Sequence, residues 1–93
     1  MTEIQLLPHV GTFAENKDIA REIRLMEILP ALEQNETVIL NFDGVDSATQ
    51  SFVHALISDV LRSHGTMILD RLQFKGCSPT IREIISIVVE YMQ

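Results

Sequence analysis

Five side chains that could do chemistry lie close together in the segment "NFDGVDSATQSF", residues 41–52. They are two carboxylates and three hydroxyls, Asp43, Asp46, Ser47, Thr49 and Ser51. Two acids at a loop could chelate Mg²⁺, although acids near a turn more often cap and solubilise it. A hydroxyl could cap a helix or carry a phosphate. This segment is therefore the first candidate for a functional site.

No other set of reactive side chains has the spacing of a catalytic or metal site. His9, His54 and His64 have no partner three or four residues away among themselves or with Cys77, so a zinc-ligand pattern is missing. The four glycines form no phosphate-binding cluster. The single cysteine permits no internal disulfide and is interpreted as a small buried thiol. We therefore predict no catalytic residue, no metal and no cofactor.

Composition limits the classes of partner. The 93 residues, 46% of them hydrophobic, suit one domain that spans residues 1–93. Against 13 acids there are only 7 basic residues, which form no cluster along the sequence, so nucleic acid is not an expected ligand. No apolar run is long enough for a membrane span, and the first residues lack the basic start of a secretory signal, so we expect a cytoplasmic protein. A chain this short could gain stability from a protein partner or a homodimer.

Three segments have the composition of β-strands. They are "EIQLL" (3–7), "TVILNF" (37–42) and "LQFKG" (72–76), and "VGTF" (10–13) between them is interpreted as a loop. The second is a continuous β-favouring run, typical of a strand that is buried on both faces. Because helical segments separate the strands, the sequence predicts a small α/β fold with a short, mostly parallel sheet of three to four strands packed with helices.

The first long helix is predicted to begin after Asn16 as its N-cap. Pro30 should kink or break this helix, after which Leu29 and Leu32 lie on a rotated face. The buried stripe is predicted to contain Ile19, Ile23 and Met26, and the solvent face Lys17, Asp18, Arg21, Glu22 and Arg24.

Two further helices follow. The one after the candidate loop should end at Gly65, and Thr66 should cap one more turn. The last should begin with Ser78 as N-cap and Pro79 in its first turn. The first of these helices should bury Phe52, Val53, Leu56, Ile57, Val60 and Leu61 and expose His54, Ser58, Asp59 and Arg62; the last should bury Ile81, Ile84, Ile85, Val88 and Met92.

The three hydroxyls of the loop have different expected tasks. Ser47 and Gln50 have the spacing of a capping box, and Thr49 is the cap if the helix starts two residues later. Either alternative leaves Ser51 in the first turn. By helical phase Ser51 shares a face with His54 and Ser58, where a protein partner could reach it.

The segment "VILNFDGVDSATQSFVHALISDVL", followed by "FKGC" and a closing helix, resembles a STAS-like bacterial domain family of unknown function. That family is related to the STAS domains of anti-sigma-factor antagonists. The resemblance covers nearly the whole chain, including "NKDIAREIR" and "ILPALE". Its most specific part is a strand followed by "FDGV", "TQSF" and "AL".

This resemblance implies a regulatory function. In the antagonists, a serine at the start of the helix after the central strand is phosphorylated by a partner kinase, and phosphorylation releases that partner. The matching residue here is Ser51. The antagonists usually have Asp-Ser-Ser/Thr-Gly at this point, whereas this chain has "TQSF", and Asp46-Ser47 lies too early in the loop.

We consider three functions. The first is a regulatory module that docks a kinase or ATPase-type partner through residues 43–51 and helix 49–63, with partner contacts from Asp43, Asp46, Ser47, Thr49, Gln50 and His54 and a phosphorylation site at Ser51. The second is a structural subunit that oligomerises through the last helix, whose apolar surface is widened by Ile87 and Val89. The third is a metal-dependent enzyme that uses Asp43 and Asp46.

Overall fold

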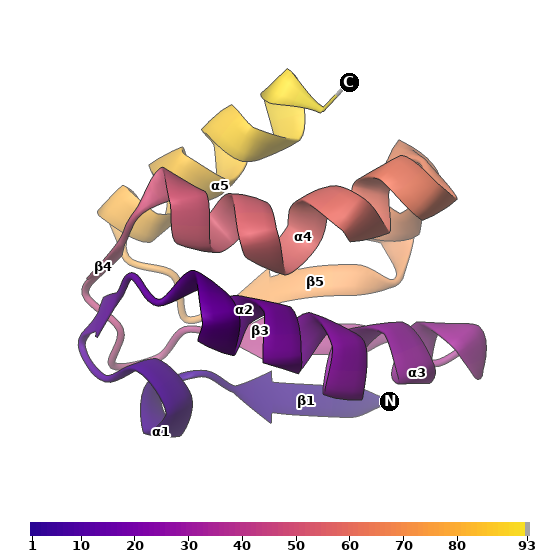
Figure 1. Cartoon of the computed structure of the whole chain (residues 1–93), viewed down its shortest axis with the longest axis horizontal. Helices are drawn as coiled ribbons and strands as arrows, with labels where there is room; N and C mark the ends of the chain where they lie inside the picture. Colours follow the sequence, from indigo (N-terminus) through magenta and orange to yellow (C-terminus); the bar gives the residue numbers. More distant parts are fainter. Residues whose placement is uncertain (93) are drawn as a thin grey trace.

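The computed structural model describes residues 1–92 and alternates short strands with helices (Figure 1). In chain order the elements are β1 (Thr2–Gln5), α1 (Leu7–Val10), β2 (Phe13–Ala14), α2 (Lys17–Ile23), the π-helical turn η1 (Arg24–Ile28), α3 (Leu29–Glu33), β3 (Val38–Asn41), β4 (Ser47–Ala48), α4 (Gln50–His64), the 3₁₀ helix η2 (Thr66–Asp70), β5 (Leu72–Lys75) and α5 (Pro79–Tyr91).

The main sheet has three parallel strands in the order β1-β3-β5. Its central strand, β3, lies within the segment of strongest β composition, and the register aligns Ile4 with Leu40 and Leu40 with Phe74. Parallel neighbours require a crossover between them, and helices supply each crossover here. The predicted small α/β fold with a short parallel sheet is therefore confirmed.

A second parallel pairing joins β2 to β4 and was not predicted. Each strand has two residues, too few to produce a detectable alternation of apolar and polar side chains. The Thr49 N–H continues this ladder by donating to the Ala14 carbonyl at 3.0 Å. The pairing ties the candidate loop to "VGTF", so the interpretation of that segment as a plain loop was wrong. The first strand is also shorter than predicted, because Leu7 already begins α1.

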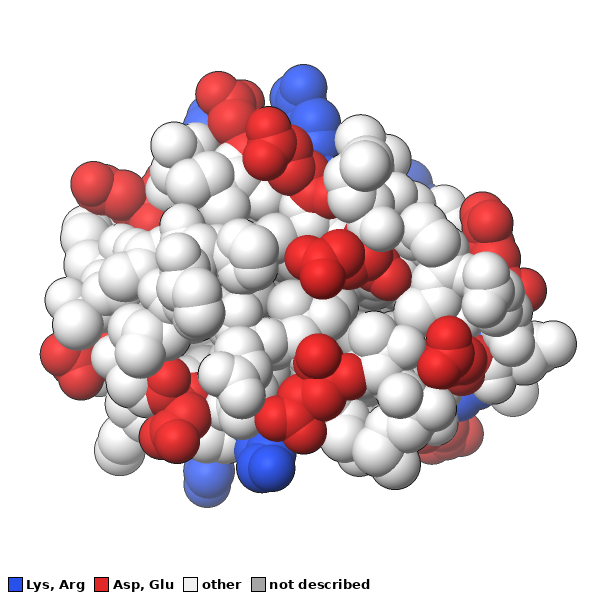
Figure 2. Space-filling model, turned by 90° about the horizontal axis from the view of Figure 1, so that it is seen from below, with Lys and Arg blue, Asp and Glu red and all other residues white. Residues whose placement is uncertain are grey.

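One face of the sheet supplies the core. Ile4, Leu40 and Leu72 are buried together with the apolar side of α4, whereas the alternating side chains of β1 and β5 are exposed. Ile39 in β3 is half-buried, so burial of this strand on both faces is only partial. Seen from the side of α1 and β1, acidic groups are spread over the surface, and basic groups show only near its rim (Figure 2).

The helix that starts at Asn16 does not break at Pro30. Asn16 caps it as predicted, since its Oδ1 accepts the N–H groups of Asp18 at 2.9 Å and Ile19 at 3.3 Å. The π-helical turn η1 precedes Pro30, and there the Leu29 N–H donates to the Arg24 carbonyl, five residues earlier. The widened turn gives the proline ring room where an α-helix would have placed a carbonyl against it.

This π-helical turn shifts the phase of the buried stripe. Met26, predicted to be buried, is 76% exposed, and Ile28 takes its place in the core. A single extra residue per turn is enough for this change, because each residue rotates the side-chain direction by about 100°. Ile23 is buried as expected, whereas Ile19 is only half-buried.

Helix α4 confirms its predicted apolar stripe, since all six of its stripe residues are buried. Thr49 is the N-cap, and its Oγ1 accepts the Phe52 N–H at 3.0 Å. The capping box of Ser47 with Gln50 is therefore wrong, because Ser47 belongs to β4. Gly65 ends the helix with φ +77°, as expected. Thr66 begins η2 but makes no capping hydrogen bond through its side chain.

Helix α5 begins as predicted. The Ser78 Oγ accepts the Ile81 N–H at 3.1 Å and also donates to the Asp46 carbonyl at 2.9 Å. Of its predicted stripe, Ile81, Ile85 and Val88 are buried, and Ile84 and Met92 are partly buried against the core. The Ser78 hydroxyl thus connects the start of α5 to the candidate loop.

The assignment of the α4 cap can be tested by stability measurements. Thr49→Ala should lower the free energy of unfolding by about 1 kcal/mol, because the Phe52 N–H loses its acceptor. Ser47→Ala is the matched control and should change it by less than about 0.5 kcal/mol. Urea unfolding followed by circular dichroism measures both. A larger loss for Ser47→Ala than for Thr49→Ala would contradict this assignment.

Candidate functional site

The candidate loop is anchored where it leaves the sheet. The Asn41 side chain is buried, and its Oδ1 accepts the Asp43 N–H at 2.9 Å while its Nδ2 donates to Glu3 Oε2 at 2.9 Å. Gly76 approaches this bond so closely that a Cβ on it would lie 2.9 Å from Asn41 Oδ1 and 2.9 Å from the Asp43 nitrogen. The position of Asp43 therefore depends on the buried amide of Asn41 and on the absence of a side chain at Gly76, the residue after β5.

Asp43 and Asp46 are exposed acids on this anchored loop. The Asp46 backbone is bonded on both sides, since its N–H donates to the Thr12 carbonyl at 2.8 Å and its carbonyl accepts from Ser78. Within residues 1–92, no group of three or more His, Cys, Asp or Glu side chains is arranged to hold a metal ion. The loop presents its two carboxylates to solvent on a braced backbone.

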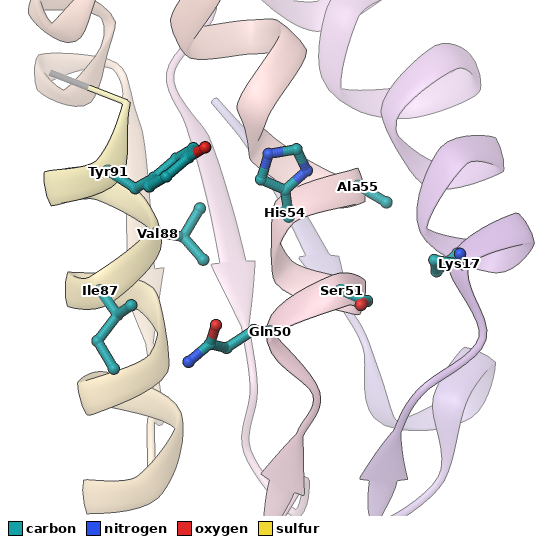
Figure 3. Close-up of a pocket in the computed structure, with 8 residues that line it drawn as sticks. All are labelled: Lys17, Gln50, Ser51, His54, Ala55, Ile87, Val88 and Tyr91. Carbon is teal, nitrogen blue, oxygen red and sulfur yellow. The ribbon is translucent and has the colours of Figure 1, made fainter.

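Ser51 lies in a different environment from these acids. It is the second residue of α4, it is exposed, and it lines an open cavity of about 450 Å³ (Figure 3). Helix α4 forms the floor of this cavity, between α2 on one side and α5 on the other. The lining residues are Lys17, Gln50, Ser51, His54, Ala55, Ile87, Val88 and Tyr91.

The two sides of the cavity differ in chemistry. On the α5 side the Tyr91 ring meets the His54 ring edge-on, with centroids 6.5 Å apart and planes at 65°. Ile87 and Val88 continue this apolar side, and Lys17 provides a cation on the α2 side (Figure 3). Hydroxyl, imidazole and ammonium groups beside apolar surface suit recognition of another molecule.

The structure brings only some of the predicted site residues together. Gln50, Ser51 and His54 share the cavity, whereas Asp43, Asp46, Ser47 and Thr49 lie outside its lining. Lys17 and Tyr91 were missed, because each is distant from the loop in sequence. One sequence signal did point to this place, namely the apolar Ile87 outside the main stripe of the last helix.

Arg24 and Ser58 contradict their predicted exposure. The Arg24 side chain is only 12% exposed, and its Nη1 donates to the Ala55 carbonyl at 2.8 Å and lies 3.2 Å from Asp59 Oδ2. Ser58 is 3% exposed. The cause is the packing of α2 and η1 against α4, which covers the side of α4 that helical phase assigned to solvent.

Cys77 is a half-buried thiol next to the start of α5. Burial raises its pKa above the usual value, and the nearby Arg82 charge offsets part of this increase. Because the thiolate is the reactive form, this environment makes the thiol a weak nucleophile at neutral pH. Cys77 was predicted to be a small buried thiol, and the structure buries it only in part.

Over residues 1–92 no helix is both long enough and apolar enough to cross a bilayer.

Comparison with known families assigns the chain to one of them. No curated protein and no solved structure matches the sequence. The model of one family matches residues 21–82, from the middle of α2 to the first turn of α5. The chain therefore belongs to the family described as the STAS-like domain of unknown function (DUF4325).

Proposed function

We propose that this chain is a regulatory binding module of the cytoplasm rather than an enzyme, and that it docks a protein partner through residues 43–51 and the exposed face of α4. The observation that carries the proposal is the position of Ser51, exposed in the first turn of α4 beside Lys17, His54 and apolar residues of α5. Open, mixed polar and apolar surface of this kind suits a protein interface. Catalysis relies instead on dry sites with preorganised dipoles.

Phosphorylation of Ser51 would provide the regulation. A phosphoserine adds about 1.5–2 negative charges and three acceptor oxygens. The first turn of α4 tolerates such a charge, because helix N-termini carry unpaired N–H groups and a positive partial charge. The STAS-like family membership supports a partner of the kinase or ATPase type, by the resemblance to anti-sigma-factor antagonists.

The switch predicts a specific effect of a negative charge at Ser51. Ser51→Asp should weaken binding of a kinase or ATPase-type partner about tenfold, because it places a carboxylate inside the interface. Ser51→Ala should bind like the wild type. Isothermal titration with purified candidate partners measures the dissociation constants.

Thr66→Asp is the matched control, since it adds the same charge to an exposed position outside α4, the candidate loop and the cavity lining. It should leave the affinity unchanged. Equal affinities for wild type and Ser51→Asp would remove the switch, and an equal loss for both aspartates would mean that net charge alone acts.

A second candidate function is a homodimer or structural subunit that assembles through α5. Two exposed apolar residues of that helix favour it, Ile87 at 41% and Tyr91 at 79%. Both line the cavity beside α4, so one surface could serve either a second copy or a different protein.

Molar mass in solution separates the two candidates. If α5 mediates assembly, light scattering should give a dimer or larger for the wild type and a monomer for Ile87→Glu, since a buried carboxylate would oppose the interface. Ser86→Glu, at the neighbouring exposed position, should keep the wild-type mass. A monomeric wild type would eliminate the oligomer.

A further inference from the structure

Basic side chains from residues 17–24 meet Arg62 of α4 at a cavity between the two segments. A second cavity there, of about 390 Å³, is lined by four of the chain's seven Lys and Arg residues and by two acids. The chain as a whole carries 13 acids. The full lining is Lys17, Asp18, Arg21, Arg24, His54, Ala55, Ser58, Asp59 and Arg62. The fold thus gathers basic residues that form no cluster along the sequence.

Positive groups outnumber negative groups in this cavity, and its ion pairs leave some of the positive groups without an acidic partner. One carboxylate, Asp59, is shared by two guanidinium groups, at 3.2 Å from Arg24 and 2.7 Å from Arg62. Lys17 and Arg21 are exposed, and within residues 1–92 neither forms an ion pair with an acid. The cavity thus presents free cations on a protein whose net charge is −6.

The basic cavity adjoins the cavity that contains Ser51. Lys17, His54 and Ala55 line both, so the two cavities share a border on the outer side of α4, and we call the pair the groove. The groove has an apolar end at Ile87 and Tyr91 and a basic end at Arg21 and Arg62. This gradient specifies the chemistry of a complementary ligand, with apolar groups at one end and negative charge at the other.

We infer that this groove takes a short acidic segment of the protein partner, with apolar side chains at the end that meets α5. The inference rests on the proposed partner-binding function and adds the chemistry of the bound segment. A helix of about twelve residues is about 18 Å long, which fits a molecule with extents of 30 × 26 × 22 Å. Residues 43–51 would contact the rest of the partner.

The remaining surface argues against a nucleic acid as the occupant. A nucleic-acid strand carries phosphates along its whole length, so it would extend beyond the groove over the rest of a chain that has 13 acids and only three Lys or Arg residues outside the basic cavity. A short acidic peptide places its charges only where the cations lie. The chain also has only 5% aromatic residues on which bases could stack.

A synthetic peptide of about twelve residues, with glutamates on one helical face and leucines at one end, is a suitable probe. In titrations of the ¹⁵N-labelled protein, the amide shift changes should concentrate in α2, in the exposed face of α4 and in the part of α5 from Ile87 to Tyr91. Affinity should fall as NaCl is raised, since the contacts lie at the surface. A peptide with lysine in place of glutamate should not bind.

Lys17→Glu/Arg21→Glu should weaken binding of the acidic peptide about tenfold. Lys75→Glu/Arg82→Glu is the matched control, because it reverses the same number of charges outside the groove, and it should weaken binding much less. Arg24 is left unchanged, since it also bonds to the Ala55 carbonyl. Lys17→Glu alone gives the same comparison if the double variant is unstable.

Three results would overturn the inference: no shift changes with the acidic peptide, equal weakening in the groove and control variants, or binding of a single-stranded oligonucleotide with the same dependence on Lys17 and Arg21. Failure of the regulatory proposal has a different signature. In that case the peptide still maps to the groove, but the full partner binds wild type and Ser51→Asp equally.

Discussion

The rotation of α4 about its own axis is the constraint on which the rest of the surface depends. Its six apolar stripe residues are buried in the common core, and each such side chain contributes roughly 1.5–3 kcal/mol. A shift of one residue would rotate the helix by about 100° and expose most of them. Because that cost is prohibitive for a small domain, Ser51 and His54 are held on the outer side. The hydrophobic core thus determines which polar groups of α4 face outward.

Packing on both flanks of α4 then converts its outer side into a groove. Helix α2 covers one flank, and Arg24 joins the two helices through the Ala55 carbonyl and Asp59. Helix α5 covers the other flank, and the Ser78 hydroxyl ties its start to the candidate loop through the Asp46 carbonyl. These polar contacts connect three elements that approach one another only in the folded chain. Loop, floor and both walls of the groove therefore form one braced unit.

The parts of this fold that sequence reasoning predicted depend on local interactions. The central strand, the stripe of α4 and the caps at Asn16 and Ser78 follow from side chains within one or two turns of each other. The predicted burial of Met26 was wrong, because the π-helical turn before Pro30 changes the helical phase and the periodicity of the sequence does not reveal such a turn. The pairing of β2 with β4 was not predicted, because a strand of two residues shows no alternation of apolar and polar side chains.

The same distinction applies to the candidate site. Gln50, Ser51 and His54 lie within two turns of one helix, so helical phase could place them on one face. Lys17 and Tyr91 join them only through tertiary packing of α2 and α5. Ser58 was misplaced for the same reason, since helical phase alone does not reveal that a neighbouring helix covers that flank. Three of the four cations of the groove, Lys17, Arg21 and Arg24, lie close together in the sequence, and only Arg62 joins them through the fold.

A phosphate on Ser51 would act on one end of the groove more than on the other. Ser51 and Arg62 are about 16 Å apart along the axis of α4, whereas screening in physiological salt limits exposed charges to about 8 Å. Lys17 lines the same cavity as Ser51, whereas Arg62 lines only the basic cavity. The added charge of about 1.5–2 would therefore offset the cation at the junction of the two cavities and leave the distant guanidinium groups available. Phosphorylation would then reduce the affinity for an acidic segment in proportion to the contacts made near Lys17, which gives a graded switch instead of complete release.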